Sequence, residues 1–333
     1  ASSSTANGVS VNGTLTAAGG NISVRGDSSS SASNRSAVYV ETTSSGVTTT
    51  GNGTVNIVGN GTNGALGVVV TRPVTTVDGS IDITGTSDSD IGLIVSFAGN
   101  IAATGTGNVT LDGTTASNST SDFGVSVSAD RVVSVNSGTL TVNGTQTGNG
   151  RAVVLSGRLL STGGGPIIVT ADAANATDFD ANMTSIIGGP AATGPITINA
   201  DEIAFSGTLS VESDGDLTIL PRTANTTIGL GNGATGTLNL DATELGFLQD
   251  GFNSITIGDA VAGTGAVDVN ASTFLDDIII VGGSISVTGL NAGTNDVALI
   301  ARTGAITDGG DVGLDISGGA ITLQTLDATT GDI

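Results

Sequence analysis

A short phrase recurs along the chain, and its spacing constrains the fold more than any other feature. The phrase Gly53-Thr-Val-Asn-Ile-Val-Gly59 has a glycine at each end and apolar residues that alternate with polar ones. Comparable phrases begin at the glycines Gly20, Gly79, Gly107, Gly138 and Gly165. From Gly53 onward these glycines are 26 to 31 residues apart. A recurring unit of this size is typical of stacked repeats rather than of one globular core.

Each unit contains three short apolar stretches that predict β-strands, because Val, Ile and Thr alternate with polar residues between turn formers. The first strand is followed by a polar loop such as residues 60–66. A glycine then leads a second strand, such as Gly67-Val-Val-Val, and a weaker third strand follows, such as Val74 to Val77. Three strands per repeat fit one coil of a β-solenoid. Inside it we expect a ladder of stacked side chains at Val55, Ile81, Val109 and Leu140.

The repeat also divides the chain by coil length. Residues 1–19 predict an N-terminal extension in which Val9 to Leu15 forms one strand, and residues 20–333 predict one continuous solenoid. Its coils are longer to about residue 195 and shorter after it. A short helix is expected at residues 242–249, where the alternation lapses. We therefore predict an all-β protein, a single parallel β-helix of roughly a dozen coils, which would be about 60 Å long at one strand spacing per coil.

Charge and composition exclude several classes of function. The formal net charge is −22, and all eight basic residues are arginines. The basic footprint of a nucleic-acid-binding protein is therefore missing, and binding to an anionic membrane surface is not expected. Without cysteine the chain has neither disulfides nor thiolate metal sites. It has no apolar run of the length that a transmembrane helix needs.

Catalysis would depend almost entirely on carboxylates, because histidine, cysteine and lysine are absent. Some polysaccharide hydrolases work with paired carboxylates. Aromatic residues make up only 2% of the chain, which argues against a sugar-binding cleft, and the candidate acids lie in turn-like contexts where aspartate is ordinary. We expect no enzyme, and a carbohydrate-active β-helix enzyme is the least favoured alternative. The candidate pairs are Asp88 with Asp90, Asp178 with Asp180, and Asp276 with Asp277.

Calcium is the one cofactor that the sequence suggests, since two segments supply several carboxylate oxygens at short spacing. Neither segment matches an EF-hand or a tandem nonapeptide repeat. Solvated acidic turns are the favoured interpretation, with calcium binding as the alternative. The residues concerned are Glu212, Asp214, Asp216, Asp308, Asp311 and Asp315.

A resemblance to a known family becomes specific in the second half of the chain. The segments that carry it are Thr227-Ile-Gly-Leu-Gly, Gly236-Thr-Leu-Asn-Leu, Phe252-Asn-Ser-Ile-Thr-Ile-Gly258, Gly263-Thr-Gly-Ala-Val-Asp-Val and the stretch from Asp296 to Asp308. Roughly residues 194–333 resemble the β-helical repeat region of filamentous-haemagglutinin-like bacterial surface proteins. The resemblance implies a right-handed parallel β-helix, an extracellular or cell-surface location, and a fibrous or adhesive role.

The function that we expect is structural: a subunit or segment of a secreted cell-surface fibre. Residues 320–333 stop in mid-pattern, so either more coils of a longer chain or another copy stacked head to tail would cover that end. An adhesin segment that binds a glycan or a host protein is the alternative. Its binding surface would be the variable loops at residues 27–36, 60–66, 86–91, 114–122 and 145–151.

Overall fold

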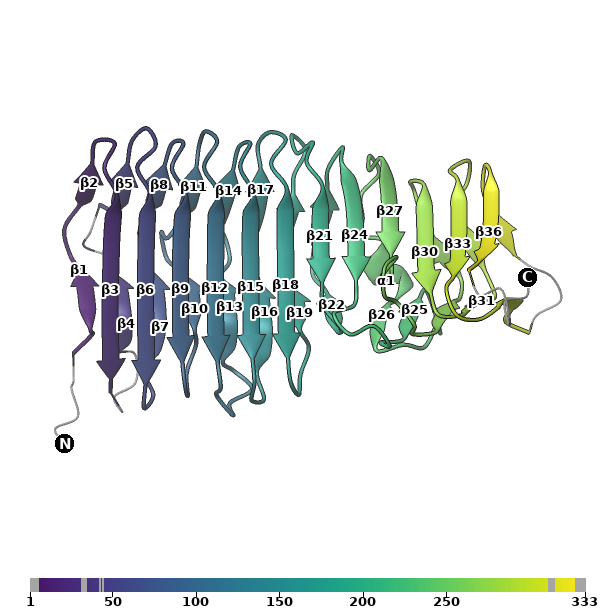
Figure 1. Cartoon of the computed structure of the whole chain (residues 1–333), viewed down its shortest axis with the longest axis horizontal. Helices are drawn as coiled ribbons and strands as arrows, with labels where there is room; N and C mark the ends of the chain where they lie inside the picture. Colours follow the sequence, from purple (N-terminus) through teal and green to yellow (C-terminus); the bar gives the residue numbers. More distant parts are fainter. Residues whose placement is uncertain (1–5, 31–34, 42, 44, 311–314, 327–333) are drawn as a thin grey trace.

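The structure, a computed structural model, describes residues 6–30, 35–41, 43, 45–310 and 315–326. In this part of the chain the strands lie side by side along the axis of a rod (Figure 1). The longest sheet has 12 strands, and consecutive members are paired in parallel, one coil apart. The prediction of a parallel β-helix of about a dozen coils is confirmed. No described helix is long and apolar enough to span a membrane.

The longest sheet runs the whole length of the rod. Its strands, in spatial order, are β3 (Ile22–Ser29), β6 (Val55–Thr62), β9 (Ile81–Ser87), β12 (Val109–Thr115), β15 (Leu140–Gln146), β18 (Ile167–Ala173), β21 (Ile196–Asn199), β24 (Asp216–Leu220), β27 (Ser254–Ile257), β30 (Ile278–Gly282), β33 (Val297–Ala301) and β36 (Ile321–Thr325).

Two eight-stranded sheets form the other faces of the first eight coils. The second sheet consists of β1 (Val9–Val11), β4 (Ser36–Val40), β7 (Leu66–Val70), β10 (Leu93–Val95), β13 (Phe123–Val127), β16 (Arg151–Leu155), β19 (Phe179–Ala181) and β22 (Ile203–Phe205). The third sheet consists of β2 (Leu15–Ala17), β5 (Val47–Thr49), β8 (Val74–Thr76), β11 (Ile101–Ala103), β14 (Val132–Val135), β17 (Arg158–Ser161), β20 (Ile186–Gly188) and β23 (Ser210–Glu212).

Two smaller sheets take over these faces toward the C-terminal end. The five-stranded sheet has the spatial order β26 (Leu238–Leu240), β25 (Ile228–Leu230), β28 (Val267–Val269), β31 (Ile285–Val287) and β34 (Ile306–Asp308). The three-stranded sheet contains β29 (Ser272–Thr273), β32 (Leu290–Asn291) and β35 (Ile316–Ser317).

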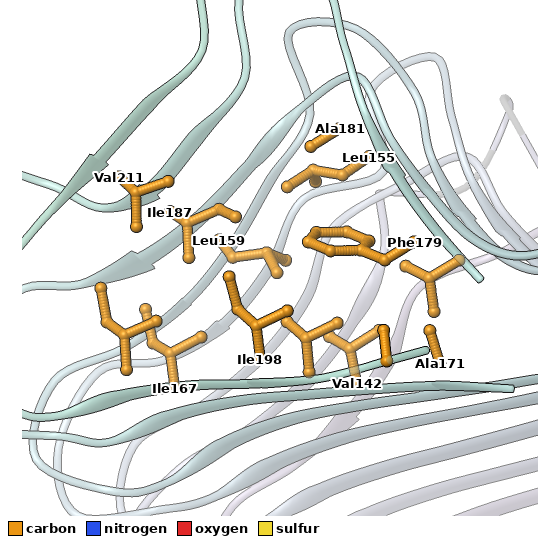
Figure 2. Close-up of a cluster of buried hydrophobic side chains, with 14 of the residues drawn as sticks. Val142, Leu155, Leu159, Ile167, Ala171, Phe179, Ala181, Ile187, Ile198 and Val211 are labelled. Carbon is orange, nitrogen blue, oxygen red and sulfur yellow. The ribbon is translucent and has the colours of Figure 1, made fainter. Parts of the chain in front are cut away.

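The interior is a set of aliphatic ladders. Val55, Ile81, Val109 and Leu140 are successive register partners and are fully buried, as the sequence predicts. Figure 2 shows the core near the middle of the rod, where Phe179 packs among aliphatic side chains from all three faces. Inward positions of the long-sheet strands are buried and alternate with more exposed outward positions, so the aliphatic residues recur at every second position.

A second ladder, made of glycines, determines the cross-section of the first coils. Gly26, Gly59, Gly85, Gly113 and Gly144 are register partners in the middle of the long-sheet strands. A Cβ added at Gly113 would lie 2.0 Å from the carbonyl oxygen of Gly124 on the second sheet. The two sheets therefore touch backbone to backbone here, and only glycine fits. The facing row on the second sheet is also small: Ala37, Gly67, Gly92, Gly124 and Ala152.

The long strands continue past these glycines, so the five predicted variable loops are shorter than expected. β9 runs to Ser87 and β12 to Thr115, for example, where a loop was predicted from residues 86 and 114. The reason is that polar residues beyond the glycine point inward and find partners there. The Ser87 hydroxyl donates to the Ala65 carbonyl at 2.8 Å, and the Gln146 Oε1 accepts from Gly148 N at 2.6 Å.

The N-terminal stretch differs from the single strand that was predicted. Val9–Val11 and Leu15–Ala17 are separate strands that pair with β4 and β5 in two different sheets. Together with β3 they form a coil of the same plan as the next. The turn between them redirects the chain, which strand alternation alone does not reveal.

One coil carries an insertion that breaks the regular order of the strands. β24 and β27 are adjacent in the long sheet although their paired residues are 38 positions apart. In between, β25 and β26 pair in parallel through a connection of only residues 231–237. β26 contacts β22, so it lies between β22 and β25, and the spatial order of the two strands is the reverse of their chain order (Figure 1).

The predicted helix is present but short. α1 spans Ala242–Leu245 and is followed by a turn, so it covers the first half of the predicted 242–249. Asp241 is its N-cap and forms a capping box with Glu244. Downstream of it, Leu248 forms an isolated parallel bridge with Val211, which continues the face of the third sheet by one residue.

Candidate functional site

The largest change in the shape of the rod occurs around Asp178. This residue follows Ala152 in the ladder of small residues on the second sheet, because Val153 is paired with Phe179. At the same level the long sheet changes, since β18 reaches Ala173 but β21 ends at Asn199. The backbone beyond β18 therefore loses its strand neighbour, and its N–H groups need other acceptors.

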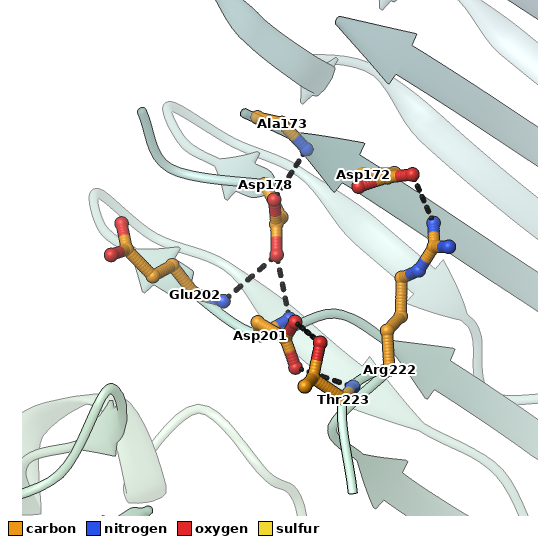
Figure 3. Close-up of polar contacts among 7 residues, drawn as sticks. All are labelled: Asp172, Ala173, Asp178, Asp201, Glu202, Arg222 and Thr223. Carbon is orange, nitrogen blue, oxygen red and sulfur yellow. Dashed lines mark hydrogen bonds and ion pairs between the residues drawn. The ribbon is translucent and has the colours of Figure 1, made fainter. Parts of the chain in front are cut away.

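The Asp178 carboxylate supplies these acceptors (Figure 3). It accepts hydrogen bonds from Ala173 N at 2.5 Å, Asp201 N at 2.6 Å and Glu202 N at 3.0 Å. The residue is only 3% exposed. Burial raises the pKa of Asp178, and the three N–H donors offset this only in part. The Asp178 carboxylate therefore caps backbone N–H groups that lack a strand partner. It is not a solvent-accessible acid.

Asp201 and Arg222 make further contacts that connect the next coil to the region around Asp178. The Asp201 carboxylate accepts from Thr223 N at 2.9 Å and from the Thr223 hydroxyl at 2.6 Å. Burial acts to raise the pKa of Asp201, but the donors on Thr223 and Thr226 outweigh it and the net pKa is lowered. Arg222 forms an ion pair with Asp172 at 2.9 Å. The cluster thus links three successive coils.

Glu244 of α1 has a similar role further along the rod. Its Oε1 accepts from Phe205 N, the last residue of β22, at 2.8 Å, and its Oε2 accepts from Asp241 N at 3.0 Å. Burial raises the pKa of Glu244. One carboxylate therefore caps both the helix and the adjoining end of the second sheet.

The candidate catalytic pairs are engaged with the backbone in the same manner. Asp277 accepts from Asp296 N in the next coil at 2.8 Å, and Asp276 accepts from Gly251 N at 2.9 Å. Asp88 accepts from Asn63 N at 3.1 Å, while Asp90 accepts from Ile91 N at 2.8 Å. Asp180 forms an ion pair with Arg151 at 3.2 Å. The two carboxylates of each pair therefore interact with different partners in the rod.

The proposed calcium ligands are spread along turns. Asp214 and Asp216 are exposed, and Asp216 accepts from the Ser254 hydroxyl at 3.1 Å. Asp308 accepts from Gly310 N at 3.2 Å, and Asp311 lies outside the described residues. Among the residues described, no group of three or more acidic side chains is arranged to hold a metal ion. Calcium binding by this set, which includes Glu212 and Asp315, stays a prediction.

A groove of about 690 Å³ lies on the outer face of the five-stranded sheet. Its floor is built of small and hydroxyl-bearing residues such as Ser284, Ser286 and Thr307, and the 235–237 loop lines one side. Asp268 in the groove accepts from Thr235 N at 2.9 Å and from the Thr235 hydroxyl at 3.2 Å. The groove is thus a consequence of the insertion, because the loop that forms its side belongs to it.

The coils at the two ends of the described rod expose edges of the core. At one end Val9, Leu15 and Ile22 are only partly buried. At the other, Ile321 is 45% exposed and Leu323 is only partly buried, whereas their register partners Val297 and Leu299 are buried. The strand edges of β3 and β36 have a described neighbour on one side only.

The fold defines the chain as a parallel β-helix. Comparison with family models, curated protein sequences and solved structures finds no match. A function for this rod must therefore be inferred from its own geometry.

Sequence reasoning named Asp178 but paired it with Asp180, whose side chain lies elsewhere, and it did not name Glu244. The sequence nevertheless contains a signal for the capping role of each residue. Asp178 stands where the repeat has Gly or Ala, and Glu244 stands at the third helical position after Asp241, as a capping box requires. The groove gave no sequence signal, since it depends on the reversed order of β25 and β26.

Proposed function

We propose that the chain is a structural rod, a segment of a secreted cell-surface fibre. The observation that supports this most directly is the parallel hydrogen-bonded ladder of 12 strands, which makes the backbone itself the continuous element along the long axis. The aspartates that would have suggested chemistry are instead used as caps between coils. We assign no catalytic step to the rod.

The resemblance of residues 194–333 to filamentous-haemagglutinin-like surface proteins supports the same proposal and motivates the extracellular location. Contact between rods would occur end to end, because the partly exposed apolar residues at both ends resemble the interior of an interrupted solenoid. Such a contact is heterologous and does not close, so it would generate a filament. The net charge of −22 would oppose side-by-side aggregation.

The experiment is electron microscopy and sedimentation of the purified chain over a range of concentrations. We expect filaments with an axial repeat close to the length of the rod. Leu323→Lys places a charge on the inward face of β36, where Leu323 pairs with buried Leu299. Gln324→Lys, the neighbouring residue on the outer face, is the matched control.

Filaments in the wild type and the control, but not in Leu323→Lys, would support assembly through the end coil. Single short rods at every concentration would reject end-to-end assembly by this chain. Compact particles without an elongated shape would reject the structural rod itself.

A further inference from the structure

The turns between the second and third sheets stack into a continuous ridge along one side of the rod. The turn ridge comprises the turns at residues 71–73, 96–100, 128–131, 156–157 and 182–185, together with Arg158, the first residue of β17. Hydrogen bonds connect neighbouring turns or the strand residue that follows them: Ala98 N donates to Thr71 O at 3.2 Å, Val132 N to Asn100 Oδ1 at 3.0 Å, and Arg158 N to Arg131 O at 2.8 Å. The ridge is separate from the five loops predicted from the sequence and from both ends of the rod.

Three of the eight arginines of this acidic chain lie on the turn ridge: Arg72, Arg131 and Arg158. Arg131 and Arg158 occupy neighbouring coils. The ion pairs within the described residues involve Arg151 and Arg222 instead, so neither of these two guanidinium groups has a described carboxylate within 4.0 Å. Exposed Asp130 also lies on the ridge and forms no ion pair with either arginine, so the ridge carries three arginines and one aspartate. In a chain with 30 acidic residues, this local excess of positive charge favours an external anion.

The fold orients the Arg131 side chain by a hydrogen bond and places Arg158 on a strand. Arg131 donates from Nε to the Ala129 carbonyl at 3.2 Å, which fixes the plane of its guanidinium. Arg158 begins β17 and lies in register between Val132 and Ile186, so its aliphatic stem has apolar neighbours on both sides. Guanidinium groups suit planar carboxylates, which can accept two parallel hydrogen bonds, and that of Arg131 is already oriented.

An exposed aromatic ring lies on the same ridge. Phe97 is 71% exposed and has a φ of 51°. This left-handed conformation is unfavourable for a bulky residue. The register of β10, β13 and β16 places Ala129 and Gly157 at the corresponding position of the next two coils. The Phe97 ring therefore contributes little to the core, and it offers an apolar surface on the coil next to that of Arg131.

We propose that the turn ridge binds an acidic polysaccharide whose charges are carboxylates, that is, a polymer of uronic acid residues. Sugar rings present apolar C–H faces to the Phe97 ring, while their carboxylates meet the forks of Arg131 and Arg158. A polymer fits because the ridge repeats every coil, so several weak contacts add up along one chain. Moderate charge density also fits, because the remainder of the protein repels a dense polyanion. This lateral binding is independent of end-to-end assembly.

The test measures binding of the full chain to immobilised polygalacturonate, with dextran, dextran sulfate and double-stranded DNA as comparison polymers. We expect binding to polygalacturonate, weakened by added salt, and none to neutral dextran. Replacing both arginines in Arg131→Gln/Arg158→Gln removes charge-assisted hydrogen bonds and should weaken binding roughly tenfold or more. Arg25→Gln removes the same charge from exposed Arg25 on the long sheet and should leave binding within about twofold.

A second variant separates binding from folding. Phe97→Gly removes the ring and relieves the left-handed strain, so the melting temperature should stay the same or rise while binding falls about threefold or more. No binding by the wild type, or unchanged binding in the double arginine variant, would overturn the proposal. Equal binding to dextran sulfate and DNA would reject the carboxylate assignment. Filament formation has no influence on these outcomes.

Discussion

The first six coils and the coils after β24 solve the same packing problem with different residues. In the first region the long-sheet strands have seven or eight residues. A glycine in the middle of the first five, replaced by Ala171 in β18, lets the facing sheet approach to backbone contact. In the second region the long-sheet strands have four or five residues, and Leu, Ile, Val and Phe side chains fill the interior. The size of the residue at one ladder position thus determines how far each coil extends.

The transition between the two regions shows how a solenoid tolerates a change of cross-section. At two places where a strand loses its neighbour, a carboxylate accepts the unpaired N–H groups: Asp178 at the end of the long strands and Glu244 beside β22. The acidic composition therefore has a structural use beyond solubility. If the two regions depend on different residues, substitutions at the glycine ladder, at the transition and in the second region should differ in the size and reach of their effects.

The largest effect is expected from Gly113→Ala in the first region. The new methyl group would lie 2.0 Å from the Gly124 carbonyl oxygen, so two sheets must separate to admit it. We expect a loss of roughly 4 kcal/mol in the free energy of unfolding, measured by denaturant titration. Gly13→Ala, with no atom within 4 Å of the added Cβ, should change it by less than about 0.5 kcal/mol. Equal effects would refute the role of the glycine ladder.

Removal of the carboxylate at the transition should have the next largest effect. Asp178→Ala leaves Ala173, Asp201 and Glu202 with unpaired N–H groups in a buried position. We expect a loss of about 3 kcal/mol in the free energy of unfolding. Asp172→Ala is the control, because its ion pair with Arg222 is solvent-exposed and is worth at most about 1 kcal/mol. A control that is as damaging as Asp178→Ala would show that Asp178 is not a special cap.

A smaller and more local effect is expected from Glu244→Ala in the second region. The substitution removes the acceptor for Phe205 N and half of the capping box of α1. We expect a loss of about 2 kcal/mol in the free energy of unfolding. Amide hydrogen exchange should accelerate at Phe205 and α1 while the glycine-ladder strands stay protected. Faster exchange throughout β6, β9 and β12 would contradict the separation into two regions.

The smallest effect concerns pH. Burial raises the pKa of Asp90, Asp178, Glu244 and Asp276 in the folded state. The folded state then binds protons more readily than the unfolded state, so the stability linked to these groups is greatest below their unfolded pKa and is lost as pH rises through the folded pKa. We expect the melting temperature to increase as pH is lowered from about 7 toward the ordinary carboxyl pKa of about 4.

The pKa of Asp201 and of Asp88 is lowered, so the stability linked to these two groups is lost at still lower pH. The melting temperature should therefore pass through a maximum. Repeating the titration at about 1 M salt screens repulsion between surface charges. A melting temperature that is insensitive to pH under these conditions would contradict the contribution of the buried carboxylates.

Much of the architecture could be predicted from the sequence because the repeat is local. The glycine-bounded alternation was sufficient to identify the strands and the ladder from Val55 to Leu140. The strand extensions beyond Gly85 and Gly113 were missed, because a polar residue that points inward looks like a loop residue until its partner is known. The parallel pair β25 and β26 was missed because neighbouring parallel strands usually need a longer connection than residues 231–237.

The candidate sites were harder to predict for a related reason. An aspartate that caps a backbone N–H in the next coil and an aspartate in an open cleft have the same local sequence context. What separates them is the neighbouring coil, about 20 to 30 residues away, as for Asp277 and Asp296 N. The turn ridge shows the same limit, because Arg131 and Arg158 become neighbours only when the coils stack.

The reversed order of β25 and β26 has a mechanical consequence. Tension on the C-terminal end of a plain solenoid peels one coil after another, since each newly exposed strand is the next one along the chain. At the insertion this sequence fails, because β26 is reached first along the chain but is held between β22 and β25. Unfolding that starts from the C-terminal side must therefore pause at the insertion until β25 and β26 detach together. The eight coils before the insertion are protected from the applied force until then.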